Sequence, residues 1–205
     1  MARSVRDIMR LSPVIPVLTI DDVASAEPIA RALVAGGLKV LEVTLRTPVA
    51  LEAIGEMAKV DGAVVGAGTV LNPGDLAASL KAGARFIVSP GLTERLAVAA
   101  IAADIPFLPG VANAGDIMRG LDLGLTHFKF FPAEAAGGRA ALASLAAPFH
   151  QVRFCPTGGI TPTSAAEWLA MPSVLCVGGS WLVPKGPPDV VAITQLARQA
   201  SALIA

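Results

Sequence analysis

The sequence predicts an α/β fold: a single-domain (β/α)8 barrel over residues 1–205, with a short helix at its N-terminus. Short apolar runs alternate with alanine-rich amphipathic stretches along almost the whole chain, which is typical of parallel strands joined by helical crossovers. Eight such units are the number that closes into a barrel, and about 200 residues suffice for one. An open doubly wound sheet is the alternative, although no G-x-G-x-x-G motif follows the first apolar run.

The predicted elements follow each other in regular order. The apolar runs that predict strands are 14–20, 39–45, 63–70, 85–90, 106–111, 127–132, 152–158 and 174–180. The stretches that predict helices are 24–35, 48–60, 73–82, 93–103, 114–123, 138–145, 163–170 and 188–203. Several helices begin at a capping residue followed by proline, as at Asn72, and several end at glycine, as at Gly83 and Gly124.

The first ten residues predict the short N-terminal helix. Val5, Ile8 and Met9 have the i, i+3, i+4 spacing of one helical face, so this helix would plug or flank the main fold. The same stretch carries several charges and has no apolar core of signal-peptide length. The longest uncharged run, 168–184, is broken by proline and glycine and does not predict a membrane span. We therefore expect a cytoplasmic protein.

Charge and cysteine usage exclude several classes of function. The chain has 16 basic and 16 acidic residues and no basic stripe, which disfavours nucleic acid or an anionic membrane as partner. Cys155 and Cys176 lie in separate apolar runs without CxxC spacing, and we interpret them as reduced core residues. His127 and His150 have no metal-ligand spacing, so we expect neither a metal site nor a cofactor.

The stretch THFKFFPAE, residues 126–134, places one lysine, Lys129, among three phenylalanines. In a strand, Lys129 and Phe131 share one face, and Phe128 and Phe130 share the other. A lysine aimed into a confined apolar space favours the neutral amine, because the ammonium ion loses its hydration. A neutral amine attacks carbonyls and forms a Schiff base. The alternative is structural: Lys129 caps the strand, reaches water, or pairs with a carboxylate.

The run LEVTLR places a carboxylate inside the predicted barrel. Leu41, Val43 and Leu45 share the face that must meet the helices, so Glu42 points inward and Arg46 lies at the rim. A carboxylate inside a barrel is costly unless it is paired or used in chemistry. A purely structural pair of Glu42 with Arg46 or with Lys129 is the alternative.

Glycine pairs follow the last two predicted strands. The chain reads Pro-Thr-Gly-Gly over 156–159 and Gly-Gly-Ser over 178–180. Loops at these positions of a barrel often bind phosphate through backbone N–H groups and a helix N-terminus. The hydroxyl groups of Thr157 and Ser180 would add donors, and a ligand that carries phosphate is the economical inference.

Six segments between Pro13 and Pro184 carry a recognisable pattern: VLEVTLRT, VGAGTVLNP, SPGLTE, FKFFPAE, RFCPTGG and VLCVGGSWLVP. In this order they closely resemble the 2-keto-3-deoxy-6-phosphogluconate (KDPG) aldolases, whose relatives include the 4-hydroxy-2-oxoglutarate (KHG) aldolases. The resemblance implies a (β/α)8 barrel that forms a homotrimer and acts as a metal-independent class I aldolase of the Entner-Doudoroff pathway.

The resemblance also implies a role for each site residue. Lys129 would be the Schiff-base lysine and Glu42 the general acid/base. Arg46 and Thr69 would hold the carboxylate of the pyruvate half of the substrate. The remaining positions are Pro90 and Phe131 for the wall of the site, Thr157 for the substrate's hydroxyl chain, and Gly158, Gly159, Gly179 and Ser180 for the phosphate. The similar phosphogalactonate aldolases lack the threonine of PTGG, so Thr157 favours the gluconate-derived substrate.

Several functions stay open beside cleavage of KDPG to pyruvate and glyceraldehyde 3-phosphate. The same iminium chemistry would serve 4-hydroxy-2-oxoglutarate or the decarboxylation of oxaloacetate. A catalytically idle phosphosugar-binding barrel is the non-enzyme alternative, and an isomerase or epimerase ranks last because it has no use for a buried lysine. Trp168 and Trp181 are compatible with either a subunit interface or a core position.

Overall fold

The computed structural model describes residues 4–184 and 186–203, and in it parallel strands alternate with helices. The strands are β1 Val14–Leu18, β2 Val40–Thr44, β3 Val64–Gly68, β4 Ile87–Val88, β5 Phe107–Leu108, β6 Gly110–Val111, β7 His127–Phe130, β8 Arg153–Pro156 and β9 Val177–Gly179. The helices are α1 Val5–Arg10, α2 Ala26–Ala35, α3 Ala50–Ala58, α4 Pro73–Lys81, α5 Glu94–Ala102, α6 Ala114–Asp122, α7 Gly138–Ala146, α8 Ala165–Leu169 and α9 Val190–Ser201, with a short 3-10 turn Val23–Ser25 before α2. The predicted alternation of strands and helices is confirmed.

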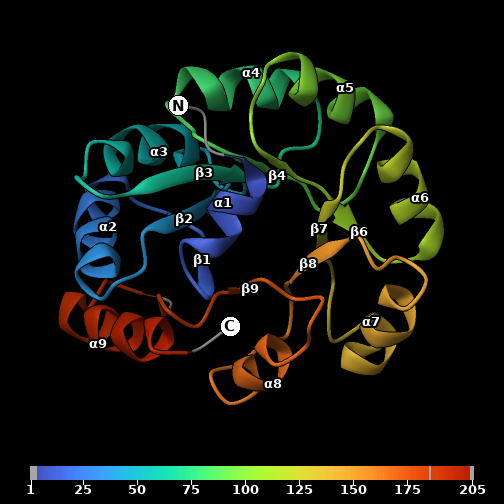
Figure 1. Ribbon diagram of the computed structural model, residues 1–205. Coiled ribbons are helices and arrows are strands. Elements are labelled where there is room, and N and C mark those ends of the chain that lie inside the picture. Colours follow the sequence, from blue (N-terminus) through green and yellow to red (C-terminus); the bar gives the residue numbers. More distant parts are fainter. Residues whose placement is uncertain (1–3, 185, 204–205) are drawn as a thin grey trace.

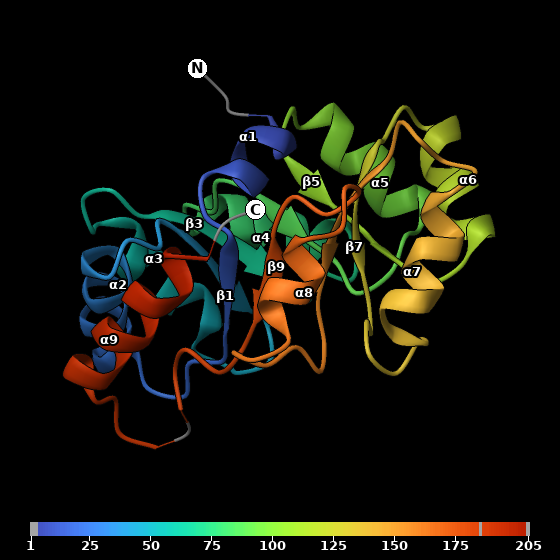
Figure 2. The same cartoon turned by 60° about the horizontal axis from the view of Figure 1, so that its bottom comes forward.

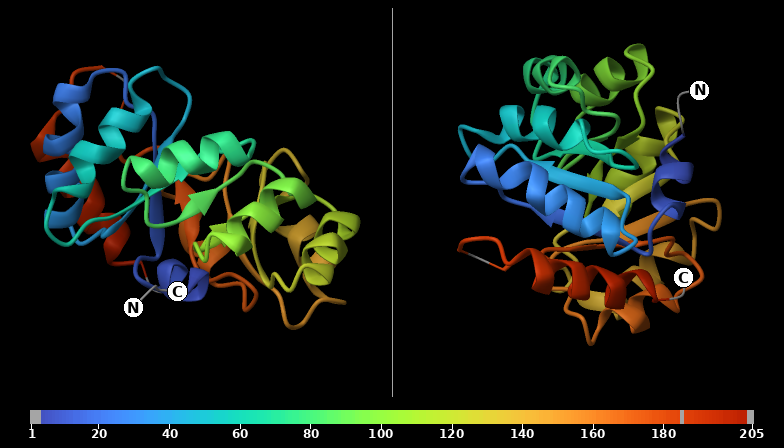
Figure 3. Two further views of the ribbon diagram at one scale, coloured as in Figure 1. Left: turned by 90° about the horizontal axis from the view of Figure 1, so that it is seen from above. Right: turned by 90° about the vertical axis from the view of Figure 1, so that its left-hand side faces the viewer.

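The strands form two parallel sheets. Six strands pair in the order β5-β4-β3-β2-β1-β9, and three pair in the order β6-β7-β8. Helices α2 to α9 lie around the outside of the strands in chain order (Figure 1). The first and last helices of this series, α2 and α9, pack side by side, and Figure 3 shows α9 in red next to α2 in blue.

One predicted strand, 106–111, was wrong as a single element. The structure divides it at Pro109 into β5 and β6, which belong to different sheets. Proline has no N–H to donate to a neighbouring strand, so the ladder is interrupted there. The carbonyl of Pro109 still accepts a hydrogen bond of 2.8 Å from the N–H of Lys129.

Helix ends follow their capping chemistry. Asn72 accepts from the N–H of Asp75 at the start of α4, and Asn113 accepts from the N–H of Asp116 at the start of α6. Each bond satisfies one of the N–H groups that a first turn leaves without a partner. These caps set where the helices begin after the carboxyl ends of β3 and β6.

The strands separate two apolar layers. Leu41 and Val43 of β2 belong to the large cluster that the strands share with the helices, while Val40 belongs to a smaller inner cluster. The inner cluster consists of Ile8, Met9, Ile15, Val40, Phe86, Val88, Leu108, Cys155 and Cys176. This division follows the period of two along each strand, as predicted for β2.

Helix α1 plugs the interior at the end where the strands begin. Its Ile8 and Met9 are buried in the inner cluster, and Figure 2 shows α1 beside the start of β1. Ser4 caps the helix, in a reciprocal pair of hydrogen bonds with Asp7. The predicted N-terminal helix is confirmed from Val5 onward, and residues 1–3 lie outside the described residues. Over 4–184 and 186–203, no helix is long and apolar enough to cross a membrane.

Candidate active site

Lys129 and Glu42 meet in the interior. Lys129 comes from β7 and Glu42 from β2, and the Nζ of Lys129 donates to Oε1 of Glu42 at 3.1 Å. The two side chains are 6% and 4% exposed. Two charges this deeply buried are tolerated because each compensates the other, and removal of either leaves an unpaired charge. Glu42 points inward as predicted, and of its two predicted partners the structure shows Lys129.

Gly68 leaves the space that the carboxylate of Glu42 occupies. Gly68 pairs with Thr44 where β2 and β3 end, and a Cβ on Gly68 would overlap with Oε1, Cδ and Cγ of Glu42. Only a residue without a side chain fits against Glu42 there. The glycine therefore determines how close the carboxylate comes to the β3 backbone.

The Phe131 ring forms an apolar wall beside the lysine. Its centroid lies 5.4 Å from the Nζ of Lys129, within the range of a cation–π interaction. Phe128 and Phe130 are fully buried on the opposite face, among the helices. The predicted division of the phenylalanines between two faces is confirmed.

Arg46 and Thr69 are in contact at the rim. They follow the paired ends of β2 and β3, and the Nε of Arg46 donates to the Thr69 hydroxyl at 3.3 Å. Thr69 has φ +59°, a left-handed backbone conformation that is unfavourable for a β-branched residue. Strain of this kind persists only where the surroundings enforce it, and it often marks a functional position. Arg46 itself is exposed to solvent.

Thr157 and the two glycine pairs lie at the ends of neighbouring strands. Thr157 is 6% exposed and forms a parallel bridge with Gly178, where a Cβ would overlap with the threonine hydroxyl. Gly158 and Gly159 have φ +102° and +81°, conformations that favour glycine. Gly179 follows Gly178 in β9, and the ring of Trp181 packs over it. Ser180, the next residue, is exposed. The two glycine pairs are therefore brought to one edge, as predicted.

Pro90 lies at the same end of the strands, after β4. Gly110 of β6 packs directly against the Pro90 carbonyl, with no room for a side chain between them. The Ser89 hydroxyl donates to the carbonyl of Gly91 at 2.7 Å and closes the turn around Pro90. Pro90 is thus placed between β4 and β6, half-buried at the rim.

Comparison with known proteins identifies the family. A family model described as KDPG and KHG aldolase matches residues 5–196. The chain belongs to this family. It is 65% identical over 200 residues to the 2-dehydro-3-deoxy-phosphogluconate aldolase of Zymomonas mobilis, covering 98% of this chain and 96% of the relative.

Two crystal structures of KDPG aldolases are closely similar to this one. The enzyme of Zymomonas mobilis ZM4 with 3-phosphoglycerate superposes with a TM-score of 0.98 at 64% identity, covering 100% of this chain and 98% of that chain. The enzyme of Legionella pneumophila, with pyruvate captured at low pH as a covalent carbinolamine intermediate, superposes with a TM-score of 0.95 at 45% identity, covering 98% and 100%.

Two buried contacts near the candidate site were not predicted. Thr44, on the same face of β2 as Glu42, is fully buried, and its hydroxyl donates to the carbonyl of Leu18 at 2.8 Å. The alternation in LEVTLR was a usable signal for it.

Trp168 donates from Nε1 to Oε1 of Glu134 at 3.0 Å, a contact between positions 34 apart that no local pattern indicates. Trp168 is fully buried, so its position is in the core.

The two cysteines lie beneath the site as free thiols. Both are buried in the inner cluster, and the Cys155 sulfur is 3.8 Å from the hydroxyl of Thr157. Burial raises the pKa of the Cys176 thiol well above its usual value, and the hydrogen bond and charge of Cys155 and the charge of Glu42 raise it further. The predicted core position of both cysteines is confirmed.

His127 lies at the opposite end of β7 from Phe131. Burial lowers its pKa below the usual value, and the positive charges of Arg6, Arg153 and Arg10 lower it further. Its Nδ1 is 3.0 Å from the Thr126 hydroxyl, and its buried Nε2 has no hydrogen-bond partner among the described residues. Over the same residues, no three His, Cys, Asp or Glu side chains form a group that could bind a metal.

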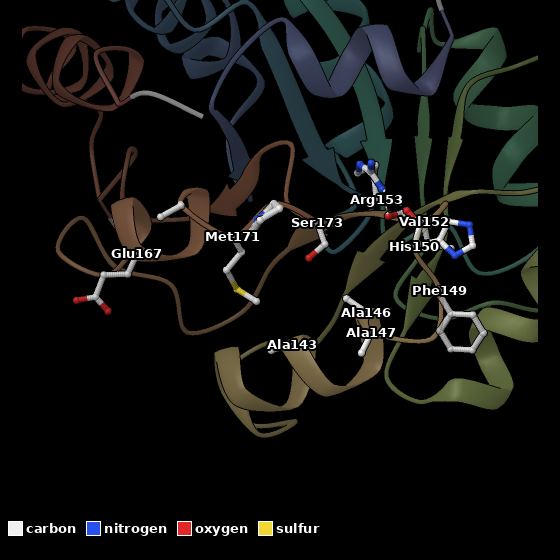
Figure 4. A pocket seen from close by; sticks show the side chains of 12 residues that line it. Ala143, Ala146, Ala147, Phe149, His150, Val152, Arg153, Glu167, Met171 and Ser173 are labelled. Carbon is white, nitrogen blue, oxygen red and sulfur yellow. Dashed lines mark hydrogen bonds between the residues drawn. The ribbon is translucent and has the colours of Figure 1, made fainter.

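A cavity of about 600 Å³ lies elsewhere, between α7 and the segment that follows α8. Figure 4 shows Ala143 and Ala146 of α7, with Ala147 just after the helix, on one side and Met171 and Ser173 on the other. Its lining includes none of the predicted site residues. The cavity therefore lies apart from the buried pair of Lys129 and Glu42.

Proposed function

We propose that the protein is a class I aldolase that cleaves 2-dehydro-3-deoxy-6-phosphogluconate to pyruvate and glyceraldehyde 3-phosphate. The observation that carries the proposal is the buried contact of 3.1 Å between Lys129 and Glu42. An amine next to a carboxylate in a site with little water has both parts of Schiff-base catalysis, a nucleophile and a proton acceptor. Membership of the KDPG and KHG aldolase family supports the substrate.

The reaction begins at Lys129. Glu42 takes a proton from the ammonium group, and the neutral amine attacks the C2 ketone of the substrate. The acid form of Glu42 then protonates the carbinolamine hydroxyl, which leaves as water and gives an iminium ion, so that Glu42 is again a carboxylate. The carbinolamine captured with pyruvate in the Legionella pneumophila KDPG aldolase supports this step for a similar protein.

Bond cleavage follows from the iminium. Glu42 takes the proton of the C4 hydroxyl, the C3–C4 bond breaks, and its electron pair moves into the iminium to form an enamine. Glyceraldehyde 3-phosphate leaves as the aldehyde. The acid form of Glu42 then protonates C3 of the enamine, and water hydrolyses the iminium to release pyruvate. One carboxylate serves each proton step because it alternates between acid and base.

Arg46 and Thr69 bind the carboxylate of the pyruvate half in this proposal. The guanidinium offers a planar, two-pronged fit to a carboxylate, and the contact of 3.3 Å with Thr69 fixes its orientation. Pro90 and Phe131 line the wall around the reacting carbon. Thr157 contacts the hydroxyl chain of the substrate.

The two glycine pairs receive the phosphate. In the proposal, Gly158, Gly159 and Gly179 donate backbone N–H groups to the phosphate, and Ser180 adds a hydroxyl donor. The structure of the Zymomonas mobilis KDPG aldolase with 3-phosphoglycerate, a phosphorylated ligand, supports a phosphate site in a similar protein.

We also propose that the two sheets close into one (β/α)8 barrel, a single domain over residues 1–205. One residue, Pro109, separates β5 from β6 and would join the sheets on one side. The parallel bridge between Thr157 and Gly178 would join β8 to β9 on the other. The inner apolar cluster, which draws on strands of both sheets, supports closure, since an open doubly wound sheet has no shared interior.

A homotrimer is the proposed assembly. Exposed apolar side chains of α5 and α6, Val98, Ile101 and Met118, offer surface for a subunit contact. Light scattering coupled to gel filtration tests it, because a mass three times that of the chain supports a trimer and a monomer mass rejects it.

The family description favours a second candidate, cleavage of the unphosphorylated 4-hydroxy-2-oxoglutarate. The two candidate functions are distinguished by the catalytic efficiency of wild-type protein with each substrate, measured as pyruvate release. A dedicated KDPG aldolase has a much higher kcat/KM with the phosphorylated substrate. In the same assay Lys129→Ala must abolish pyruvate release from both substrates, and turnover near the wild-type rate would refute the Schiff-base mechanism.

A further inference from the structure

The segment after β7 runs along the glycine pair after β8, which we call the glycine loop (Gly158 and Gly159). The N–H of Ala133 donates to the carbonyl of Thr157 at 2.8 Å, and the N–H of Glu134 donates to the carbonyl of Gly158 at 3.1 Å. These two hydrogen bonds continue the pairing of β7 with β8 beyond the ends of both strands. The glycine loop is thus attached to the segment that carries Lys129.

The side chain of Glu134 packs against Gly159 of the glycine loop. A Cβ on Gly159 would lie 2.7 Å from both Cβ and Cγ of Glu134, closer than such atoms approach each other. Because Gly159 also has φ +81°, the backbone and its neighbour both require glycine there. The aliphatic part of Glu134 therefore supports Gly159 directly.

Trp168 fixes the far end of the same side chain. Its Nε1 donates to Oε1 of Glu134 at 3.0 Å, and the indole has this single donor. Trp168 is fully buried on α8, the helix that follows the glycine loop, and its ring lies 6.4 Å from that of Phe130. The side chain that supports Gly159 is consequently held by α8 at its far end.

We infer that Glu134 and Trp168 are positioning residues that hold the glycine loop at a set distance from Lys129 and thereby determine recognition of the substrate's phosphate. This inference rests on the proposed function, in which the loop binds that phosphate. The Schiff-base carbon and the phosphate are opposite ends of one substrate, so a displaced loop moves the phosphate away from its donors while the pyruvate end still reaches Lys129.

The test compares two substrates that differ only in the phosphate, 2-dehydro-3-deoxy-6-phosphogluconate and 2-dehydro-3-deoxygluconate. Glu134→Ala removes the acceptor, and Trp168→Phe removes the donor but keeps an aromatic ring. Each variant should raise KM for the phosphorylated substrate about tenfold, the size of one lost charge-assisted hydrogen bond. The kcat/KM with the unphosphorylated substrate should stay within about twofold of wild type, since that substrate makes no contact with the loop.

Two further variants separate the hydrogen bond from charge and from general stability. Glu134→Gln retains an oxygen acceptor for Trp168 and should keep the wild-type KM. Arg139→Ala removes an exposed contact between Arg139 and Glu167 that also joins α7 to α8, and it should leave both substrates unaffected. The double variant Glu134→Ala/Trp168→Phe should be no worse than the worse single variant, because both remove the same hydrogen bond.

Three outcomes in the variants would overturn the inference and leave the proposed function intact. Equal losses of kcat/KM with both substrates would indicate a structural role only. A wild-type KM in Glu134→Ala would show that the loop needs no support from this side chain. A severe KM defect in Glu134→Gln would assign the effect to the charge of Glu134. Wild-type protein without any phosphate preference would overturn the proposed phosphate site itself, and with it the inference. Because Glu134→Ala changes a surface side chain, it remains a test even where Trp168→Phe destabilises the core.

Discussion

Gly68 lies so close to the carboxylate of Glu42 that a methyl group on its Cα would overlap with Oε1. Gly68→Ala should therefore push Glu42 away from Lys129 and lower kcat by about 100-fold or more, the usual contribution of a well-placed general base. Overpacking of the interior should also cost about 1–3 kcal/mol of unfolding free energy. Pyruvate release and urea unfolding measure the two effects.

The control for this variant is Gly55→Ala, in the middle of α3. A Cβ there meets only the Ala82 carbonyl at 3.6 Å, an ordinary contact, so activity should be unchanged and stability equal or higher. Normal turnover in Gly68→Ala would show that the position of Glu42 does not matter.

Lys129 and Glu42 should show the stability pattern of a buried ion pair. Lys129→Met leaves the carboxylate of Glu42 buried without a partner and should lower the unfolding free energy by about 3–5 kcal/mol. The double variant Lys129→Met/Glu42→Leu should be more stable than Lys129→Met alone, because no unpaired charge remains. Urea unfolding at pH 7 measures both, and a double variant less stable than the single one would contradict the pairing.

The strained backbone of Thr69 predicts a separation of stability from activity. Thr69→Gly relieves the unfavourable φ of +59° and should be at least as stable as wild type, while the lost contact with Arg46 should raise KM for the substrate about tenfold. Thr69→Val keeps the strain and loses the hydroxyl, so it should show the same KM defect without any gain in stability. Thermal unfolding and steady-state kinetics together decide the point.

Protonation of His127 should make the folded protein less stable in acid. Since its pKa in the folded protein is lowered, the unfolded chain binds the proton first as the pH falls through about 6.5, and the unfolding free energy decreases until the folded pKa is reached. His127→Gln should remove this component, so that the difference from wild type changes between pH 7 and 5. His150→Gln, at an exposed position after α7, is the control. Parallel pH profiles for wild type and His127→Gln would contradict the prediction.

Much of the fold and the centre of the site were predictable because their signals are local. The alternation along LEVTLR and FKFFP decides which side chains face inward, and it placed Glu42, Lys129 and Phe131 correctly. Capping residues and glycines decide where helices begin and end, and the predicted helices agree with the structure apart from a few terminal residues.

Features that depend on contacts between distant segments were not predictable. The division of 106–111 at Pro109 arises from pairing with strands on both sides, and the contact of Glu134 with Trp168 requires α8 to lie against the segment after β7. The positive φ of Thr69 had no signal either, because threonine is among the residues that least favour that conformation.

Reductive trapping tests the central claim most directly. The protein is incubated with pyruvate, reduced with sodium borohydride, and digested for peptide mass spectrometry, with Lys129→Ala as the control. The account predicts one modified lysine, Lys129, with no adduct in the variant. A folded wild-type protein without an adduct, or with the adduct on another lysine, would contradict the proposed Schiff-base mechanism.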